Sequence, residues 1–180
     1  MRRTVFAIAL TGTCLALATT LGAQKTTQTK MGEGGSPHVR SEWTVDGANI
    51  SIEYGRPFVK GRPIAQVAPP GQEWRTGADE ATTIKTDKAL MFGALHVPSG
   101  TYTLYTLPSD GKWQLIVSKK TGQWGTPYPK GEDLGRVPIT AGNPPAAAEQ
   151  LTISIDDTKA GATLHIEWGS TRLSAPFTTM

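Results

Sequence analysis

Residues 151–177, LTISIDDTKAGATLHIEWGSTRLSAPF, contain the clearest structural pattern in this chain of 180 residues. Apolar side chains stand at every second position within three short runs, residues 151–155, 164–168 and 173–177. Alternation with a period of two predicts β-strands that bury one face. Glycine, serine and aspartate separate the runs, as expected for turns. This end of the chain is therefore predicted to be a meander of antiparallel strands.

The same alternation continues toward the N-terminus. Further runs of this kind cover residues 39–45, 50–54, 102–106 and 113–117. Asp46-Gly47 separates the first two and is typical of a two-residue hairpin turn. We therefore predict an all-β fold over residues 37–180, a single antiparallel β-sandwich or open barrel of roughly eight to ten strands. Trp43, Trp113 and Trp168 fall on the apolar phase of these strands and are predicted to lie in the core.

The first 36 residues have a different composition. Residues 1–23 begin with Arg2 and Arg3, contain no acidic residue, and end an apolar run in Gly22-Ala23. This layout predicts a cleaved signal peptide and a periplasmic or secreted protein. A membrane span needs about 20 mostly apolar residues, whereas threonines interrupt this run, so no integral span is predicted in the mature form. Residues 24–36 are polar and are predicted to be a flexible linker.

The charge and the cysteine content of the chain exclude some classes of function. The whole chain has a formal charge of +3 and one cysteine, Cys14. Removal of residues 1–23 takes away two arginines and Cys14, which leaves a charge of +1 and no cysteine. Such a chain has no overall attraction for nucleic acid and no disulfide framework. No ligand set with metal spacing and no phosphate-cradling motif occurs, so neither a metal nor a cofactor is predicted.

One segment lacks alternation. Residues 55–83, GRPFVKGRPIAQVAPPGQEWRTGADEATT, separate two predicted strands. Loops of this length inside a compact domain are uncommon and often functional. Guanidinium groups hold carboxylate or phosphate in bidentate fashion, and a tryptophan offers a flat apolar wall. The ligand-binding candidates are Arg56, Lys60, Arg62, Trp74, Arg75 and Glu80, together with Trp124 from a later turn-rich stretch. The alternative is that these residues tie the loop to the sheet.

The acidic residues at the end of this loop suggest an alternative function, in which the protein is an enzyme. Glu80 is a weak candidate for a hydrolase or lyase assisted by neighbouring arginine or lysine, which predicts a raised pKa for this carboxyl group. In a strand, Asp79 and Glu80 would point to opposite faces, so the two carboxylates are not expected to share one site. His165 is predicted to lie on an exposed polar face of its strand.

Several short motifs occur together in order. They are Tyr54-Gly55-Arg56-Pro57, Lys60-Gly61-Arg62, Trp74-Arg75-Thr76-Gly77-Ala78, Glu80-Ala81-Thr82-Thr83, Gly100-Thr101-Tyr102-Thr103-Leu104, Trp124-Gly125, Tyr128 and Trp168-Gly169. The ordered set resembles a bacterial domain-of-unknown-function family, family 2911, from about Ser36 to Phe177. The resemblance implies an exported bacterial protein of β-rich fold and transfers no activity. Asp79 stands where the family often carries asparagine.

These observations favour a non-enzymatic binding module over an enzyme. The expected ligand is a small anionic or carbohydrate-like molecule, or a protein partner in the cell envelope. The first alternative is the hydrolase or lyase that uses Glu80. The second is a purely structural envelope protein whose exposed sheet edge pairs with a partner.

Overall fold

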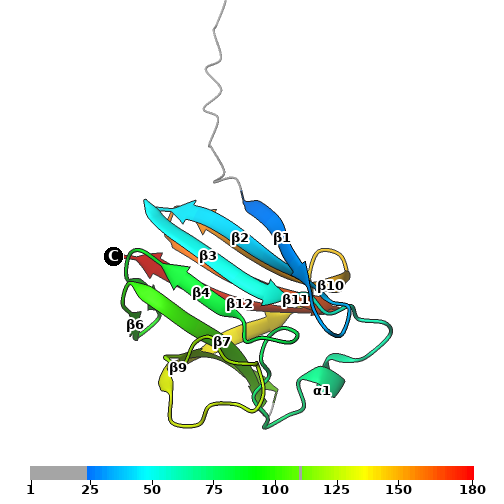
Figure 1. Cartoon of the computed structure of the whole chain (residues 1–180). Coiled ribbons are helices and arrows are strands. Elements are labelled where there is room, and N and C mark those ends of the chain that lie inside the picture. Colours follow the sequence, from blue (N-terminus) through cyan, green and yellow to red (C-terminus); the bar gives the residue numbers. More distant parts are fainter. Residues whose placement is uncertain (1–23, 110) are drawn as a thin grey trace, which may run out of the picture.

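The computed structural model describes residues 24–109 and 111–180, which form an all-β fold (Figure 1). The predicted signal peptide, residues 1–23, lies outside the described residues. The strands are β1 (Lys25–Met31), β2 (Pro37–Val45), β3 (Ala48–Gly55), β4 (Thr83–Thr86), β5 (Leu90–Phe92), β6 (Leu95–Val97), β7 (Gly100–Ser109), β8 (Lys112–Ser118), β9 (Asp133–Gly142), β10 (Ala148–Thr158), β11 (Gly161–Gly169) and β12 (Thr171–Thr179). A short helix, α1 (Ile64–Val67), projects from the sheet. No helix in the described part of the chain is long and apolar enough to cross a bilayer.

The strands form one curled antiparallel sheet. Its order is β1-β2-β3-β4-β7-β8-β9-β12-β11-β10, and the short pair β5 and β6 joins it through β12. The curl brings β2 close to β10, although these two strands are not hydrogen-bonded neighbours. The all-β antiparallel prediction is confirmed, but the sheet resembles a half-barrel rather than two separate sheets. Over the described residues it has twelve strands, more than predicted, because β1 is exposed on both faces and β4, β5 and β6 are too short to show alternation.

The apolar faces of the strands meet inside the curl. Trp43, Trp113 and Trp168 are 4%, 9% and 2% exposed, which confirms their predicted place in the core. Burial of a large apolar side chain stabilises a fold by about 1.5–3 kcal/mol. The predicted hairpin turn is also present, because Asp46 and Gly47 have φ angles of 47° and 74°. Both values lie in the left-handed region that a tight two-residue hairpin requires.

Strand β1 corrects the prediction of a flexible linker over residues 24–36. Lys25–Met31 pairs with β2 in antiparallel register, and every residue of β1 is exposed. The backbone groups of β1 are therefore satisfied by the edge of β2, while neither face of β1 is buried. A strand of this kind needs no apolar side chains, so its composition resembles that of a linker.

The irregular segment between β3 and β4, residues 56–82, is anchored at both ends. Near its start, the backbone N–H of Val59 donates to the carbonyl of Glu149 on the edge strand β10 at 2.7 Å. Near its end, Trp74 and Thr106 of β7 exchange two backbone hydrogen bonds of 2.8 and 2.9 Å. Helix α1 lies between these anchors (Figure 1). This 56–82 loop therefore covers part of the β10 edge and is held against the sheet.

Candidate functional site

Three of the predicted cationic residues line one hollow beside the 56–82 loop. This hollow of about 400 Å³, called here the basic pocket, is lined by Lys60, Arg62 and Arg75. Its remaining walls are residues 34–36 of the turn between β1 and β2, Pro57-Phe58, and Ala78-Asp79. The basic pocket is therefore lined by the β1–β2 turn and by both ends of the 56–82 loop.

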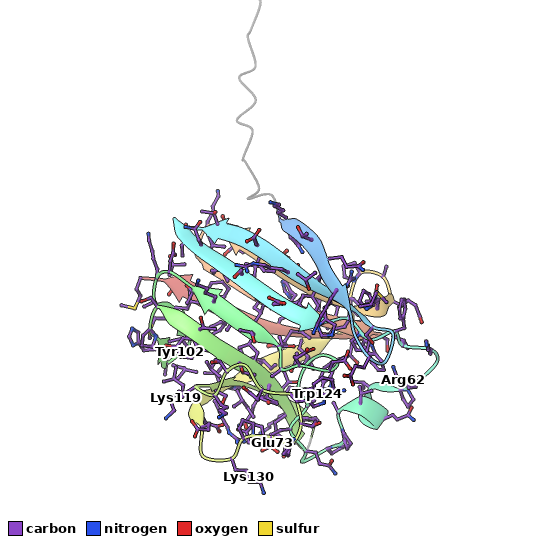
Figure 2. The ribbon with its side chains drawn as sticks, in the orientation of Figure 1. Arg62, Glu73, Tyr102, Lys119, Trp124 and Lys130 are labelled. Atoms are coloured by element: carbon purple, nitrogen blue, oxygen red, sulfur yellow. The ribbon has the colours of Figure 1, made fainter. Side chains whose placement is uncertain are left out.

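Arg62 is held in place by backbone and aromatic contacts. Its Nε donates to the carbonyl of Val59 at 3.1 Å, and one terminal nitrogen donates to the carbonyl of Phe58. The guanidinium carbon lies 5.4 Å from the centroid of the Trp168 ring, a cation–π distance. Figure 2 shows Arg62 on the side of the molecule from which α1 projects. None of these contacts neutralises the positive charge.

Arg75 reaches the pocket from the other end of the loop. Its Nε donates to the carbonyl of Gly77 at 3.2 Å, and Nη1 donates to the carbonyl of Asp79 at 3.3 Å. The side chain lies against Gly125, where a Cβ atom would overlap Arg75 Cδ. The glycine therefore provides the space that lets the Arg75 stem lie flat.

The three cations have no acidic partner in the part of the chain that the structure describes. Within residues 24–109 and 111–180, no carboxylate oxygen lies within 4.0 Å of a side-chain nitrogen of Lys60, Arg62 or Arg75. The three acidic residues of the loop face elsewhere: Glu73 lies 3.5 Å from Arg136 of β9, Asp79 lies 3.0 Å from His38, and Glu80 is paired with Lys30. Each arginine of the pocket uses two nitrogens for carbonyls, so N–H donors of both guanidinium groups remain for an anion.

The structure separates the other predicted ligand-binding residues from this pocket. Arg56 turns toward β10, where its Nε donates to the carbonyl of Leu151 at 2.7 Å and Nη2 to Thr152 Oγ1 at 3.0 Å. Trp74 is 5% exposed and belongs to the core. Trp124 is 41% exposed but does not line the basic pocket. Arg56 therefore ties the loop to the sheet, as the structural alternative expects.

Glu80 lines a different hollow, of about 380 Å³, with Lys30 and His38. Its carboxylate is ion-paired with the Lys30 ammonium group, and this contact holds the pKa of Glu80 below its ordinary value. The hydrolase or lyase alternative expects the opposite, a raised pKa. Glu80 also forms an isolated backbone bridge with Trp124. Its observed surroundings favour a carboxylate that stays ionised, not a general acid.

A buried pair that the sequence did not indicate lies between the two hollows. His38 and Asp79 are 2% and 7% exposed, and His38 Nε2 lies 3.0 Å from Asp79 Oδ2. The same nitrogen is 3.6 Å from Glu80 Oε2. Asp79 has a φ of 61°, a left-handed conformation that aspartate and asparagine tolerate. Asp79 is not in a strand, so the strand argument does not apply to it. Both carboxylates approach His38, although Asp79 lines the basic pocket and Glu80 lines the other hollow.

Glycine positions make room for this pair. At Gly32, a Cβ atom would overlap Asp79 Oδ2 and lie 2.9 Å from His38 Nε2. At Gly55, a Cβ atom would overlap the carbonyl oxygen of Ala78. The β1–β2 turn and the end of β3 can therefore approach the 56–82 loop closely only because Gly32 and Gly55 lack a side chain.

His165 also differs from its prediction. It is 8% exposed, its Nδ1 lies 2.9 Å from Ser174 Oγ, and its Nε2 lies 3.2 Å from Asp156 Oδ2. Burial and the nearby charge of Arg172 lower the pKa of His165. The prediction of an exposed histidine is wrong, because neighbouring polar side chains on β10 and β12 cover it. Among the described residues, no group of three or more histidine or acidic side chains could hold a metal ion.

Comparison with known proteins places the chain in a family. A family model described as "Protein of unknown function (DUF2911)" matches residues 36–177. No curated protein and no solved structure matches the chain. The matched region runs from the turn before β2 into β12 and includes every residue of the 56–82 loop. Because the match covers most of the sequence, the chain belongs to the DUF2911 family of proteins of unknown function.

Proposed function

We propose that this protein is a binding module for a small anionic ligand held in the basic pocket. The observation that carries this proposal is that Arg62 and Arg75, which line the same hollow from opposite ends of the 56–82 loop, have no acidic partner among the described residues. Within that part of the chain, the only carboxylate in the pocket lining is that of Asp79, which is directed to His38 at 3.0 Å. Positive charge in the pocket therefore exceeds negative charge.

The side chains of Arg62 and Arg75 are already held in place in the protein without a ligand. Backbone carbonyls hold both guanidinium groups, and Trp168 and Gly125 support their side chains. Less conformational entropy is lost when a group that is already ordered binds a ligand. Hydrogen bonds to charged groups contribute about 1.5–3 kcal/mol each. Lys60 is exposed at the same pocket and adds a third positive charge.

Isothermal titration calorimetry with inorganic phosphate and with glucuronic acid, at low ionic strength, tests the proposal. We expect saturable binding of at least one of these anions and a loss of affinity of about tenfold or more in Arg75→Gln. Arg40→Gln is the matched control, because Arg40 is a surface cation on β2 that pairs with Glu42 away from the pocket. The proposal fails if neither anion binds, or if both substitutions weaken binding equally.

The two alternatives receive less support. The hydrolase or lyase requires Glu80 to act as an acid, whereas Lys30 keeps its carboxyl pKa low. The structural envelope protein requires an open sheet edge. The 56–82 loop covers part of the β10 edge, and the opposite edge strand carries Lys25 and Lys30. Lysines on an edge strand discourage pairing with another chain.

We also propose that the protein is exported. The support for this is the sequence of residues 1–23, with its two arginines, apolar run and small residues before Gln24. N-terminal sequencing of the protein recovered from an envelope or culture-medium fraction would test it. The expected first residue is Gln24 or one close to it, whereas a protein that retains Met1 in the cytoplasm would contradict export.

A further inference from the structure

The basic pocket shares part of its lining with a second hollow. This second hollow, called here the amide compartment, has a volume of about 400 Å³. It shares Pro57, Arg62, Arg75 and Ala78 with the basic pocket. The two hollows therefore adjoin along these residues, and both arginines lie at the border between them.

The amide compartment differs in chemistry from the basic pocket. Besides the charged residues Arg62, Glu73 and Arg75, its lining includes neutral amides and a hydroxyl, from Gln66, Gln72 and Thr126. Both glutamines are exposed. Val67 and Pro69, both half-buried, give it an apolar wall, whereas Trp74 is 5% exposed and adds little surface. Exposed amides beside an apolar wall suit a sugar ring, whose hydroxyl groups form hydrogen bonds while its C–H face packs.

The negative charge in the lining of the amide compartment already has a partner. Glu73 is its acidic lining residue, and the carboxylate lies 3.5 Å from the Arg136 guanidinium group, outside the compartment. The remaining charges are those of Arg62 and Arg75 at the border. A ligand that extends from the basic pocket into this compartment therefore meets positive charge at its centre and neutral polar groups beyond it.

Size gives a further indication. Each hollow falls within the range of about 300–1,000 Å³ that is usual for small-molecule sites. A single phosphate or carboxylate group would fill only part of one hollow. The shared lining of the two hollows and the position of both arginines in it favour a ligand that extends into both hollows, with an acidic group at the arginine border.

We propose that the ligand is an acidic oligosaccharide that spans both hollows. A sugar carboxylate lies between Arg62 and Arg75, and neighbouring neutral sugar rings occupy the amide compartment and contact Gln66 and Gln72. This inference rests on the proposed anion-binding function and goes further, because it assigns the class of the ligand and the role of the second hollow.

Calorimetry with three sugars tests this assignment. The probes are glucuronic acid, the acidic trisaccharide glucuronosyl-xylobiose, and neutral xylobiose. We expect the trisaccharide to bind about tenfold tighter than glucuronic acid, and xylobiose to show no measurable binding. Gln72→Ala should weaken trisaccharide binding severalfold and leave the Kd for glucuronic acid unchanged. Gln28→Ala, on the exposed strand β1, is the matched control and should change neither Kd.

The outcomes separate this inference from the function on which it rests. Equal affinity for glucuronic acid and the trisaccharide overturns the oligosaccharide assignment and leaves anion binding intact. Tighter trisaccharide binding that is unaffected by Gln72→Ala places the neutral rings elsewhere and also overturns it. If phosphate, glucuronic acid and the trisaccharide all fail to bind, the proposed function itself is wrong. Circular dichroism of each variant checks that the fold is retained.

Discussion

His38 Nε2 on β2 lies 3.0 Å from Oδ2 of Asp79, the residue whose backbone carbonyl accepts a hydrogen bond from Arg75. The buried pair thus connects the sheet to the part of the 56–82 loop that lines the basic pocket. The left-handed φ of Asp79 turns its side chain toward the histidine and its carbonyl toward the arginine. Stability of the loop and placement of Arg75 are therefore expected to depend on the same residue.

Substitution of Asp79 tests this connection. Asp79→Ala leaves a buried histidine without its partner and should lower the free energy of unfolding by about 3 kcal/mol. Asp79→Asn keeps an oxygen acceptor and tolerates the left-handed conformation, so its effect should be about 1 kcal/mol or less. Urea denaturation of the three proteins measures both values. An alanine variant as stable as the wild type would show that the pair does not anchor the loop.

Two glycines of the β1–β2 turn, Gly32 and Gly34, allow a matched comparison of stability. A methyl group at Gly32 would overlap the Asp79 carboxylate, whereas one at Gly34 would meet nothing within 4 Å. Gly32→Ala is therefore expected to destabilise the fold by about 1–3 kcal/mol, the usual cost of overpacking. Gly34→Ala should stay within about 0.5 kcal/mol of the wild type. Thermal unfolding would distinguish them, and equal melting temperatures would contradict the close packing of turn and loop.

Gly125 is predicted to affect binding through Arg75. A Cβ atom at this position would overlap Arg75 Cδ, so Gly125→Ala should displace the guanidinium group from the border of the two hollows. We expect affinity for glucuronic acid to fall about tenfold. Gly142→Ala, at the end of β9 with open space around it, is the control. Unchanged affinity in Gly125→Ala would mean that the position of Arg75 does not determine binding.

His165 should make stability depend on pH. Burial and Arg172 lower its pKa in the folded state, against the opposing effects of Asp156 and Glu167. The unfolded chain therefore takes up a proton near pH 6.5, while the folded chain resists protonation until the pH is lower. This contribution to stability is present above pH 6.5 and is lost as the pH falls through the folded-state pKa.

Substitution isolates that contribution. The free energy of unfolding of the wild type should decline more steeply between pH 7 and pH 5 than that of His165→Gln. His96→Gln, on exposed β6, should retain the steeper decline that comes from His165. Denaturant titrations at several pH values would measure the slopes. Parallel slopes for the wild type and His165→Gln would contradict the lowered pKa.

The parts of the fold that the sequence predicts correctly are those with one buried face. Residues 151–177 alternate because one face of β10, β11 and β12 packs into the core. Strand β1 has no buried face, and its pairing with β2 depends on a neighbouring edge that local composition does not reveal. Whether a β-rich chain forms one curled sheet or two packed sheets depends on long-range pairing, which alternation within single strands does not specify.

For the candidate site, the sequence indicated the residue types but not their grouping. The unbalanced positive charge of the loop is visible in the sequence, but Arg56 turns to β10 while Arg62 and Arg75 line one pocket. Their separation depends on the path of the loop across the sheet edge. The contact between His38 and Asp79 joins residues 41 positions apart. This contact depends on the left-handed backbone conformation of Asp79, which no alternation pattern predicts.

The most direct test of the central claim is an NMR titration of the arginine Nε–H signals with glucuronic acid. The Nε–H groups of Arg62 and Arg75 are hydrogen-bonded to carbonyls, and the Arg62→Gln and Arg75→Gln spectra assign them. If the basic pocket binds anions, both signals will shift and saturate with one common Kd, while the Arg40 signal will stay in place. Stationary Arg62 and Arg75 signals at high glucuronic acid concentration, or an equal shift at Arg40, would contradict the claim.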